Sequence, residues 1–190
     1  LDFMPGTAQY YSAVLAFDVL AAVVERATGT DYGSFVKKEI FLPLGMERTS
    51  YRLSDFLPCE LARTCACKDG VLTPEPLHSA FEDFPAGYTG GGAGLVSTLN
   101  DYMLFAEELL RALSGKGRIL SRESAAEMSR PQLSKEIEGI SDFYNWGLGV
   151  RALAAQCEWQ PLPAGSFGWS GAYGTHFWVD PAGGAVAVYM

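Results

Sequence analysis

Apolar residues recur at helical spacing in separate segments of the chain before Pro131. This periodicity predicts four helices, over residues 13–27, 32–41, 98–113 and 120–128. The first is rich in Ala, Val and Leu, begins beside Ser12 and ends at Thr28-Gly29. Thr98 has Asp101 three residues further on, which is the spacing of a helix N-terminal cap.

The pattern becomes strand-like after Asn145. Short runs of aromatic and apolar residues, bounded by Gly and Pro, predict four strands over residues 146–150, 166–170, 175–180 and 185–189. Residues 65–73, with Asp69-Gly70 at the centre, predict a separate hairpin. Helices followed by antiparallel strands predict an α+β fold.

Two segments between these elements lack periodicity. Residues 74–88 turn to Pro, Glu, Asp and aromatic residues, which predicts a long loop over the surface. Residues 131–140 predict a connecting loop that carries charges of both signs.

Composition agrees with a globular domain and excludes some partners. The 190 residues are 48% hydrophobic and 13% aromatic, enough to bury a sizeable core. The net charge is −8 and there is no Lys/Arg cluster, which argues against nucleic acid or an anionic membrane as partner. No apolar run approaches the roughly 20 residues that span a bilayer. Localisation stays open between the cytoplasm and export.

The four cysteines allow two interpretations. Cys65 and Cys67 alternate as a pair on one side of an extended segment would, while Cys59 and Cys157 stand apart. A zinc site needs further ligands, and neither histidine, His78 or His176, is near a Cys pair in sequence. Free thiols are therefore expected rather than a metal site.

Two short segments carry the candidate chemistry. Pro5-Gly6-Thr7 leads into Tyr11 and Ser12 at the predicted start of the first helix. Residues 168–175 read Gly-Trp-Ser-Gly-Ala-Tyr-Gly-Thr inside an aromatic, strand-like stretch. Glycines in a strand let a ligand approach the backbone closely, and a strand edge can offer N–H groups to an oxyanion.

Four motifs in order resemble the serine β-lactamase and penicillin-binding-protein superfamily, in its class C-related, esterase-like branch. They are Pro5-Gly6-Thr7 with Tyr11-Ser12, residues 41–46, residues 91–98 with Asp101-Tyr102, and Trp169-Ser170-Gly171 with Gly174-Thr175 and Asp180-Pro181. The resemblance covers nearly all of the chain. It implies one incomplete β-lactamase/transpeptidase-like domain, with a mostly helical region at 1–140 and antiparallel strands of the α/β part at 141–190.

The resemblance also implies parts that this chain does not carry. The family nucleophile is the serine of a Ser-x-x-Lys motif before the tyrosine motif, and a C-terminal helix follows the last strand. Ser34 and Lys37 have the Ser-x-x-Lys spacing but follow the tyrosine, so they are expected to be ordinary surface residues. The chain alone is expected to be inactive.

Site roles follow from the resemblance. Tyr11 matches the general base or proton relay, Ser12 a supporting hydrogen-bonding residue, and the Ala172 N–H an oxyanion donor. Trp169, Ser170 and Gly171 occupy the place of the substrate-binding Lys-Thr-Gly triad. Tryptophan brings no charge, so a substrate carboxylate loses its partner there.

Two further positions qualify these roles. Ala13 stands where the family commonly has an asparagine that binds an acylamino group, which disfavours β-lactams. His176 is expected to be structural rather than a catalytic base, because the resemblance assigns it no role.

The resulting hypothesis is a serine hydrolase that works through an acyl-enzyme, on a small-molecule ester or amide rather than a β-lactam, with no metal or organic cofactor. Self-association through exposed sheet surface is a further expectation. The alternative is a non-catalytic binding or regulatory pseudoenzyme of the same fold. The presence of an upstream Ser-x-x-Lys segment favours the enzyme, and its absence favours the pseudoenzyme.

Overall fold

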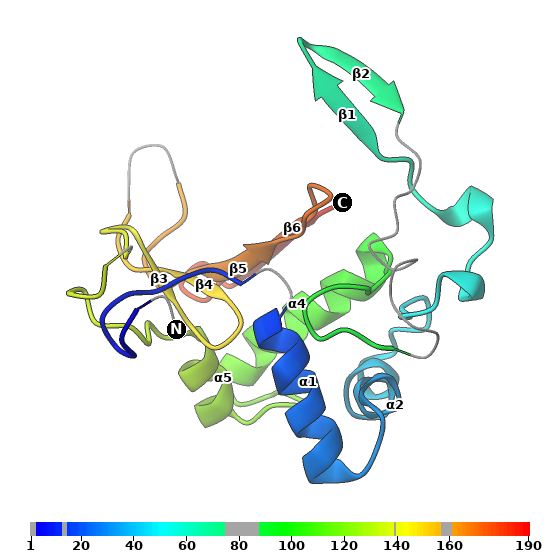
Figure 1. Ribbon diagram of the computed structural model, residues 1–190. Helices are drawn as coiled ribbons and strands as arrows, with labels where there is room; N and C mark the ends of the chain where they lie inside the picture. Colours follow the sequence, from blue (N-terminus) through cyan, green and yellow to red (C-terminus); the bar gives the residue numbers. More distant parts are fainter. Residues whose placement is uncertain (1–2, 13–14, 75–87, 139, 157–160) are drawn as a thin grey trace. The chain divides into compact units, whose positions relative to one another are not determined.

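The computed structural model describes residues 3–12, 15–74, 88–138, 140–156 and 161–190 (Figure 1). The chain divides into two compact units, and each is described by itself. Unit 1 contains Leu1–Tyr11, Ile40–Glu47 and Thr98–Met190, and unit 2 contains Ser12–Glu39 and Arg48–Ser97. The expected boundary at residue 140 stays a prediction.

Unit 1 is built on a five-stranded antiparallel sheet whose strands lie in chain order. The strands are β3 (Tyr144–Trp146), β4 (Arg151–Leu153), β5 (Phe167–Ser170), β6 (His176–Asp180) and β7 (Ala185–Tyr189). The predicted strands 166–170, 175–180 and 185–189 are confirmed. After β6, the Asp180 carboxylate accepts the N–H groups of Ala182 and Gly183, which stabilises the turn into β7.

The strand predicted over residues 146–150 is wrong. Strand β3 ends at Trp146, and residues 147–150 form the turn into β4, closed by a 2.8 Å hydrogen bond from the Gly147 N–H to the Val150 carbonyl. Gly149 has a φ of 83°, which glycine adopts without strain. The alternating glycines therefore belong to a hairpin turn rather than to a strand.

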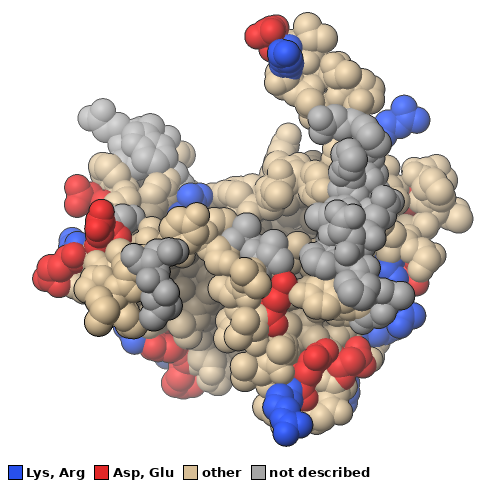
Figure 2. Space-filling model, in the orientation of Figure 1, with Lys and Arg blue, Asp and Glu red and all other residues tan. Residues whose placement is uncertain are grey.

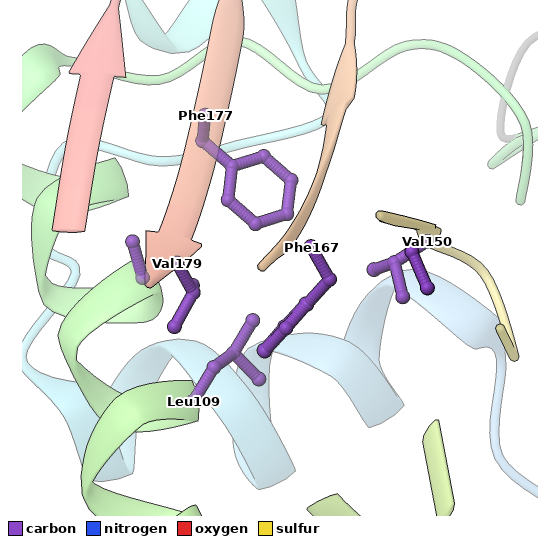
Figure 3. Packing of buried hydrophobic residues seen from close by; sticks show 7 residues of the cluster. Leu109, Val150, Phe167, Phe177 and Val179 are labelled. Atoms are coloured by element: carbon purple, nitrogen blue, oxygen red, sulfur yellow. The ribbon is translucent and has the colours of Figure 1, made fainter. Parts of the chain in front are cut away.

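The core of unit 1 lies between the sheet and helix α4 (Leu99–Leu113), which packs against β6 and β7. Leu109 from the helix meets Phe167, Phe177 and Val179 from the sheet, with Val150 beside them (Figure 3). The predicted cap is confirmed, because the Thr98 side chain accepts the Asp101 N–H. Helices α3 (Leu42–Leu44) and α5 (Arg122–Ser129) also belong to this unit.

A buried carboxylate holds the segment that follows α4. Glu108 lies inside unit 1 with 2% of its surface exposed. Its Oε1 atom accepts the backbone N–H groups of Arg118 and Ile119, at 2.5 and 2.8 Å. The carboxylate thus replaces the water that these two N–H groups lose on folding.

Unit 2 contains α1 (Leu15–Thr28), α2 (Tyr32–Val36), a π-helical turn Lys37–Phe41 that runs on into unit 1, two 3₁₀ turns (Leu53–Asp55 and Pro58–Glu60), and the hairpin of β1 (Cys65–Lys68) and β2 (Val71–Pro74). The predicted hairpin is confirmed. The helix predicted over residues 32–41 changes from α- to π-helical hydrogen bonding at Lys37.

The Asp18 carboxylate of α1 organises the glycine-rich segment of unit 2. Its Oδ1 atom accepts the N–H groups of Gly91 and Gly92, at 2.8 and 3.2 Å. A hydrogen bond to the same carboxylate raises the pKa of Tyr88. A Cβ at Gly91 would collide with the Phe17 carbonyl oxygen, so the close approach of this loop to α1 requires glycine.

The charged surface agrees with the acidic composition. Figure 2 shows Lys and Arg as separate small groups on the face drawn, several of them beside Asp or Glu. Within the described part of the chain, no helix has both the length and the apolar character needed to cross a membrane.

We expect Glu108→Ala to lower the free energy of unfolding by about 3 kcal/mol, because the backbone N–H groups of Arg118 and Ile119 lose a charged acceptor. Urea denaturation measures the change. Glu107→Ala, one residue earlier on the exposed side of α4, is the matched control and should change stability by less than about 0.5 kcal/mol. Equal effects of the two substitutions would contradict the assigned role of Glu108.

Candidate functional site

Three aromatic rings from distant parts of the sequence meet in unit 1. Tyr11 stacks on Trp146, with ring centroids 6.1 Å apart and planes inclined by 12°. The Tyr11 and Trp169 rings lie 5.5 Å apart, and the Trp146 and Trp169 rings 4.9 Å apart. The structure therefore brings the candidate residues Tyr11 and Trp169 into contact. The order of the motifs along the sequence does not by itself predict this contact.

The segment before Tyr11 is held by main-chain pairing. Ala8 forms a parallel bridge with Glu138. The Gln9 N–H donates to the Glu138 carbonyl at 3.2 Å, and the Glu138 N–H donates to the Thr7 carbonyl at 3.3 Å. Tyr11 thus follows a segment anchored to unit 1 and lies outside the described part of helix α1.

The turn between β5 and β6 presents Ala172 to solvent. The Gly174 N–H donates to the Gly171 carbonyl at 3.1 Å, and the Gly171 N–H donates to the Thr175 carbonyl at 2.7 Å. Gly174 has a φ of 84°, so the connection is a three-residue hairpin loop with a left-handed glycine at its end. Among the described residues, the Ala172 N–H has no hydrogen-bond acceptor.

Gly168 in β5 and Gly171, the residue after β5, both lie close to the segment that pairs with them. A Cβ at Gly168 would collide with the Phe177 carbonyl oxygen, and one at Gly171 with the Thr175 hydroxyl. The backbone that approaches Gly168 is therefore that of strand β6, whereas the sequence pattern predicted a ligand there.

Ser170 and His176 face each other across the β5–β6 ladder. They are register partners, and the Ser170 Oγ lies 2.7 Å from the His176 Nδ1. The His176 ring meets the buried Trp178 edge to face, with centroids 5.3 Å apart. Burial, together with the positive charge of Arg151, lowers the pKa of His176. A histidine expected to be structural thus contacts a candidate substrate-binding residue directly.

Arg151 was not among the sequence candidates, and the structure places it beside Trp169. Its guanidinium carbon lies 4.6 Å from the ring centre of Tyr144, 5.6 Å from that of Trp169 and 5.9 Å from that of Trp178. Its Nε atom is buried and has no hydrogen-bond partner among the residues described. The positively charged guanidinium of Arg151 therefore lies close to Trp169, whose own side chain is uncharged.

The position of Arg151 beside Trp169 follows from the β3–β4 hairpin. Arg151 pairs with Trp146 across that hairpin and with Gly168 on the other side. Because residues 146–150 were predicted as one strand, the pairing could not be anticipated. Recognition of Gly147 and Gly149 as turn residues would have placed Arg151 across from Trp146.

Ser12 and the spurious Ser-x-x-Lys pair belong to unit 2. The Ser12 Oγ accepts the Ala16 N–H at 3.4 Å, which supports its position near the start of α1. Ser34 and Lys37 are both exposed, and the Asp31 side chain caps α2 by accepting the Ser34 N–H. Ala13 lies outside the described residues, as do His78, Cys157 and residues 75–87 of the long loop.

The described thiols belong to Cys59, Cys65 and Cys67, which are exposed and not paired in disulfides. In the part of the chain that the structure covers, no three His, Cys, Asp or Glu side chains lie together in a group that could hold a metal ion.

The comparisons with known proteins agree with the motifs. Residues 1–190 match the family described as Beta-lactamase. Esterase EstB of Burkholderia gladioli is 33% identical over 203 residues, which cover 96% of this chain and 49% of the esterase. The chain thus spans about half the length of the curated relatives that it matches.

Solved structures share the fold. EstCE1, described as a hydrolase with promiscuous acyltransferase activity, is similar with a TM-score of 0.80 and 26% identity, over 97% of this chain and 51% of that protein. Simvastatin synthase (LovD) from Aspergillus terreus is similar with a TM-score of 0.81 and 22% identity, over 97% of this chain and 50% of the synthase. The fold is therefore α+β of the β-lactamase/transpeptidase kind.

We expect the Trp146 and Trp169 rings to stabilise each other. In a double-mutant cycle with Trp146→Leu and Trp169→Leu, the coupling free energy should be about 0.5–1.5 kcal/mol, the value typical of aromatic pairs in contact. Urea denaturation of the four proteins measures it. Additive losses of stability would show that the two rings do not interact in solution.

Proposed function

Because the chain belongs to the Beta-lactamase family, we propose that it is part of a serine hydrolase that forms an acyl-enzyme with an ester or a small amide. The contact between Tyr11 and Trp169 carries the proposal. It joins the tyrosine of the proton-transfer motif to the position where β-lactamases have the lysine of Lys-Thr-Gly. The names of the relatives EstB and EstCE1, an esterase and a hydrolase, support an ester substrate.

The proposed nucleophile is the serine of a Ser-x-x-Lys segment that this chain does not include. That serine attacks the substrate carbonyl, and Tyr11 shares the proton transfer with the lysine of the same segment. Tyr11 is 49% exposed, which leaves room for such partners beside it. On this proposal the 190 residues alone do not turn over substrate by this route.

Ala172 is the proposed second donor of the oxyanion hole. Ala172 is exposed in the hairpin loop, and its N–H lacks an acceptor among the described residues. A backbone donor fixed by a hydrogen-bonded turn needs little reorganisation when charge develops on the carbonyl oxygen.

Trp169, Ser170 and Gly171 are the proposed substrate-binding segment, with Ser12 in support. The half-buried indole of Trp169 offers an apolar surface where a lysine would offer a charge. An apolar surface favours uncharged acyl groups. The nearby Arg151 guanidinium supplies part of the positive charge that the lysine of Lys-Thr-Gly would have provided. No step of this proposal requires a metal or an organic cofactor.

Self-association is a further proposal. Strand β7 is at the edge of the sheet, and Ala185, Ala187 and Tyr189 on one of its faces are exposed. In unit 2, helix α1 exposes Leu15, Val19 and Val23, which lie at a spacing of four residues. Exposed apolar surface of this kind favours contact with another copy or with further parts of the protein.

We expect Tyr11→Phe to lower ester turnover by about 10²- to 10⁴-fold, because the ring contacts remain while the proton-transferring hydroxyl is lost. The protein is expressed from the full open reading frame, and kcat/KM is measured with a short-chain chromogenic ester. Tyr10→Phe, at the 82% exposed neighbouring residue, is the control and should retain wild-type turnover. Unchanged turnover in Tyr11→Phe would remove Tyr11 from the mechanism.

We expect Ala172→Pro to lower kcat by about 10²- to 10³-fold, because proline has no N–H to donate to the oxyanion. Residue 172 follows the first residue of the turn, a position that proline adopts readily. Ala172→Ser keeps the N–H and should keep most of the activity. Similar kcat values for the two variants would contradict the donor role. Absence of turnover and of any covalent adduct in the unsubstituted protein would instead favour a binding or regulatory pseudoenzyme.

A further inference from the structure

Ser170 and His176 have the arrangement of a nucleophile and its base. The hydroxyl oxygen and the imidazole Nδ1 are in hydrogen-bond contact at 2.7 Å. Ser170 is exposed, while His176 is half-buried beside Trp178. We propose that Ser170 and His176 form a nucleophile–base pair that accepts acyl or phosphonyl groups from activated electrophiles. Its nucleophile differs from the Ser-x-x-Lys serine of the proposed function, although Ser170 belongs to the substrate-binding segment of that proposal.

The pair is mounted on strands rather than on loops. Ser170 ends β5, His176 begins β6, and the two are cross-strand partners one pair away from the hairpin loop. The loop is closed by the two hydrogen bonds of Gly171 and Gly174. The Trp178 ring, edge to face with the imidazole, limits the rotation of His176. A nucleophile and a base held in contact on rigid elements, with a third group that orients the base, is the general requirement for activation.

The surroundings of His176 favour its neutral form, which is the form that can take a proton. Burial and the positive charge of Arg151 on β4 both lower the pKa of His176. On the other side, its cross-strand partner on β7 is Tyr189. Asp180, at the far end of β6, uses its Oδ1 atom to accept the N–H groups of Ala182 and Gly183.

The reaction with an aryl ester balances without a further reactant. The Ser170 Oγ attacks the carbonyl carbon, and its proton moves to the His176 Nδ1. The bond from the carbonyl carbon to the aryloxy oxygen breaks, the phenolate leaves, and the imidazolium returns its proton to the phenolate or to solvent. With a fluorophosphonate, the Oγ–P bond forms and fluoride leaves. The N–H of the exposed residue Ala172, two residues after Ser170, is a candidate donor to the developing oxyanion.

The test is site-specific labelling of the protein expressed from the full open reading frame. The protein is treated with a fluorophosphonate, digested, and the adduct mass is assigned to peptides. We expect an adduct on the peptide that contains Ser170, and loss of that adduct in Ser170→Ala. Labelling of Ser170 should fall at least about 10²-fold in His176→Gln, which keeps a hydrogen-bond acceptor but has no base. Exposed Ser34, whose hydrogen-bond partner among the described residues is Asp31 rather than a histidine, is the internal control and should stay unlabelled.

The pH dependence is a second readout. Because the neutral imidazole is required, the labelling rate of Ser170 should fall as the pH drops through a value below about 6.5, the ordinary pKa of histidine. Absence of label on Ser170 in the wild type, or a wild-type rate in a His176→Gln protein with native near-UV circular dichroism, would overturn the proposal. Labelling of a Ser-x-x-Lys serine appears on a different peptide. The same digest therefore reports on the two proposals separately, through the peptide of the Ser-x-x-Lys serine and the peptide of Ser170.

Discussion

The antiparallel pairing of β5 with β6 is the constraint on which the rest of unit 1 depends. Gly168 lies so close to the Phe177 carbonyl that no side chain fits, which lets the two strands approach and buries Phe167 beside Val179. The same pairing sets Ser170 opposite His176 and closes the loop that carries Ala172. Core packing and candidate chemistry thus share one set of backbone hydrogen bonds, and a shift in register would remove both.

A cluster of aromatic rings and one guanidinium joins the remaining site residues to this hairpin. Trp169 contacts Tyr11 and Trp146, and Arg151 lies over Tyr144, Trp169 and Trp178. Aromatic faces attract a cation, and the interaction is stronger where water is excluded. Arg151 is therefore held at the sheet by rings, and its positive charge in turn favours the neutral form of His176. The charge balance of the site depends on a residue from a neighbouring strand.

Two carboxylates provide hydrogen-bond acceptors for backbone N–H groups in the loops, as neighbouring strands do in the sheet. Glu108 accepts two N–H groups that follow α4, and Asp18 accepts two in the glycine-rich segment of unit 2. In each case one oxygen satisfies two backbone donors that no helix or strand can pair. Irregular segments with many glycines can in this way keep a defined course near regular elements.

Local sequence determined most of the elements and the family. The cap at Thr98, the hairpin at Asp69-Gly70 and three of the strands follow from short-range patterns, because capping, turn conformation and side-chain alternation are set by neighbouring residues. The same patterns misassigned residues 146–150, where glycines at every second position imitate a strand. Only the tertiary structure decided that Tyr11 meets Trp169, that Arg151 stands beside it and that Ser170 faces His176. These contacts join residues whose proximity depends on strand register and on pairing between distant segments, which no local preference encodes.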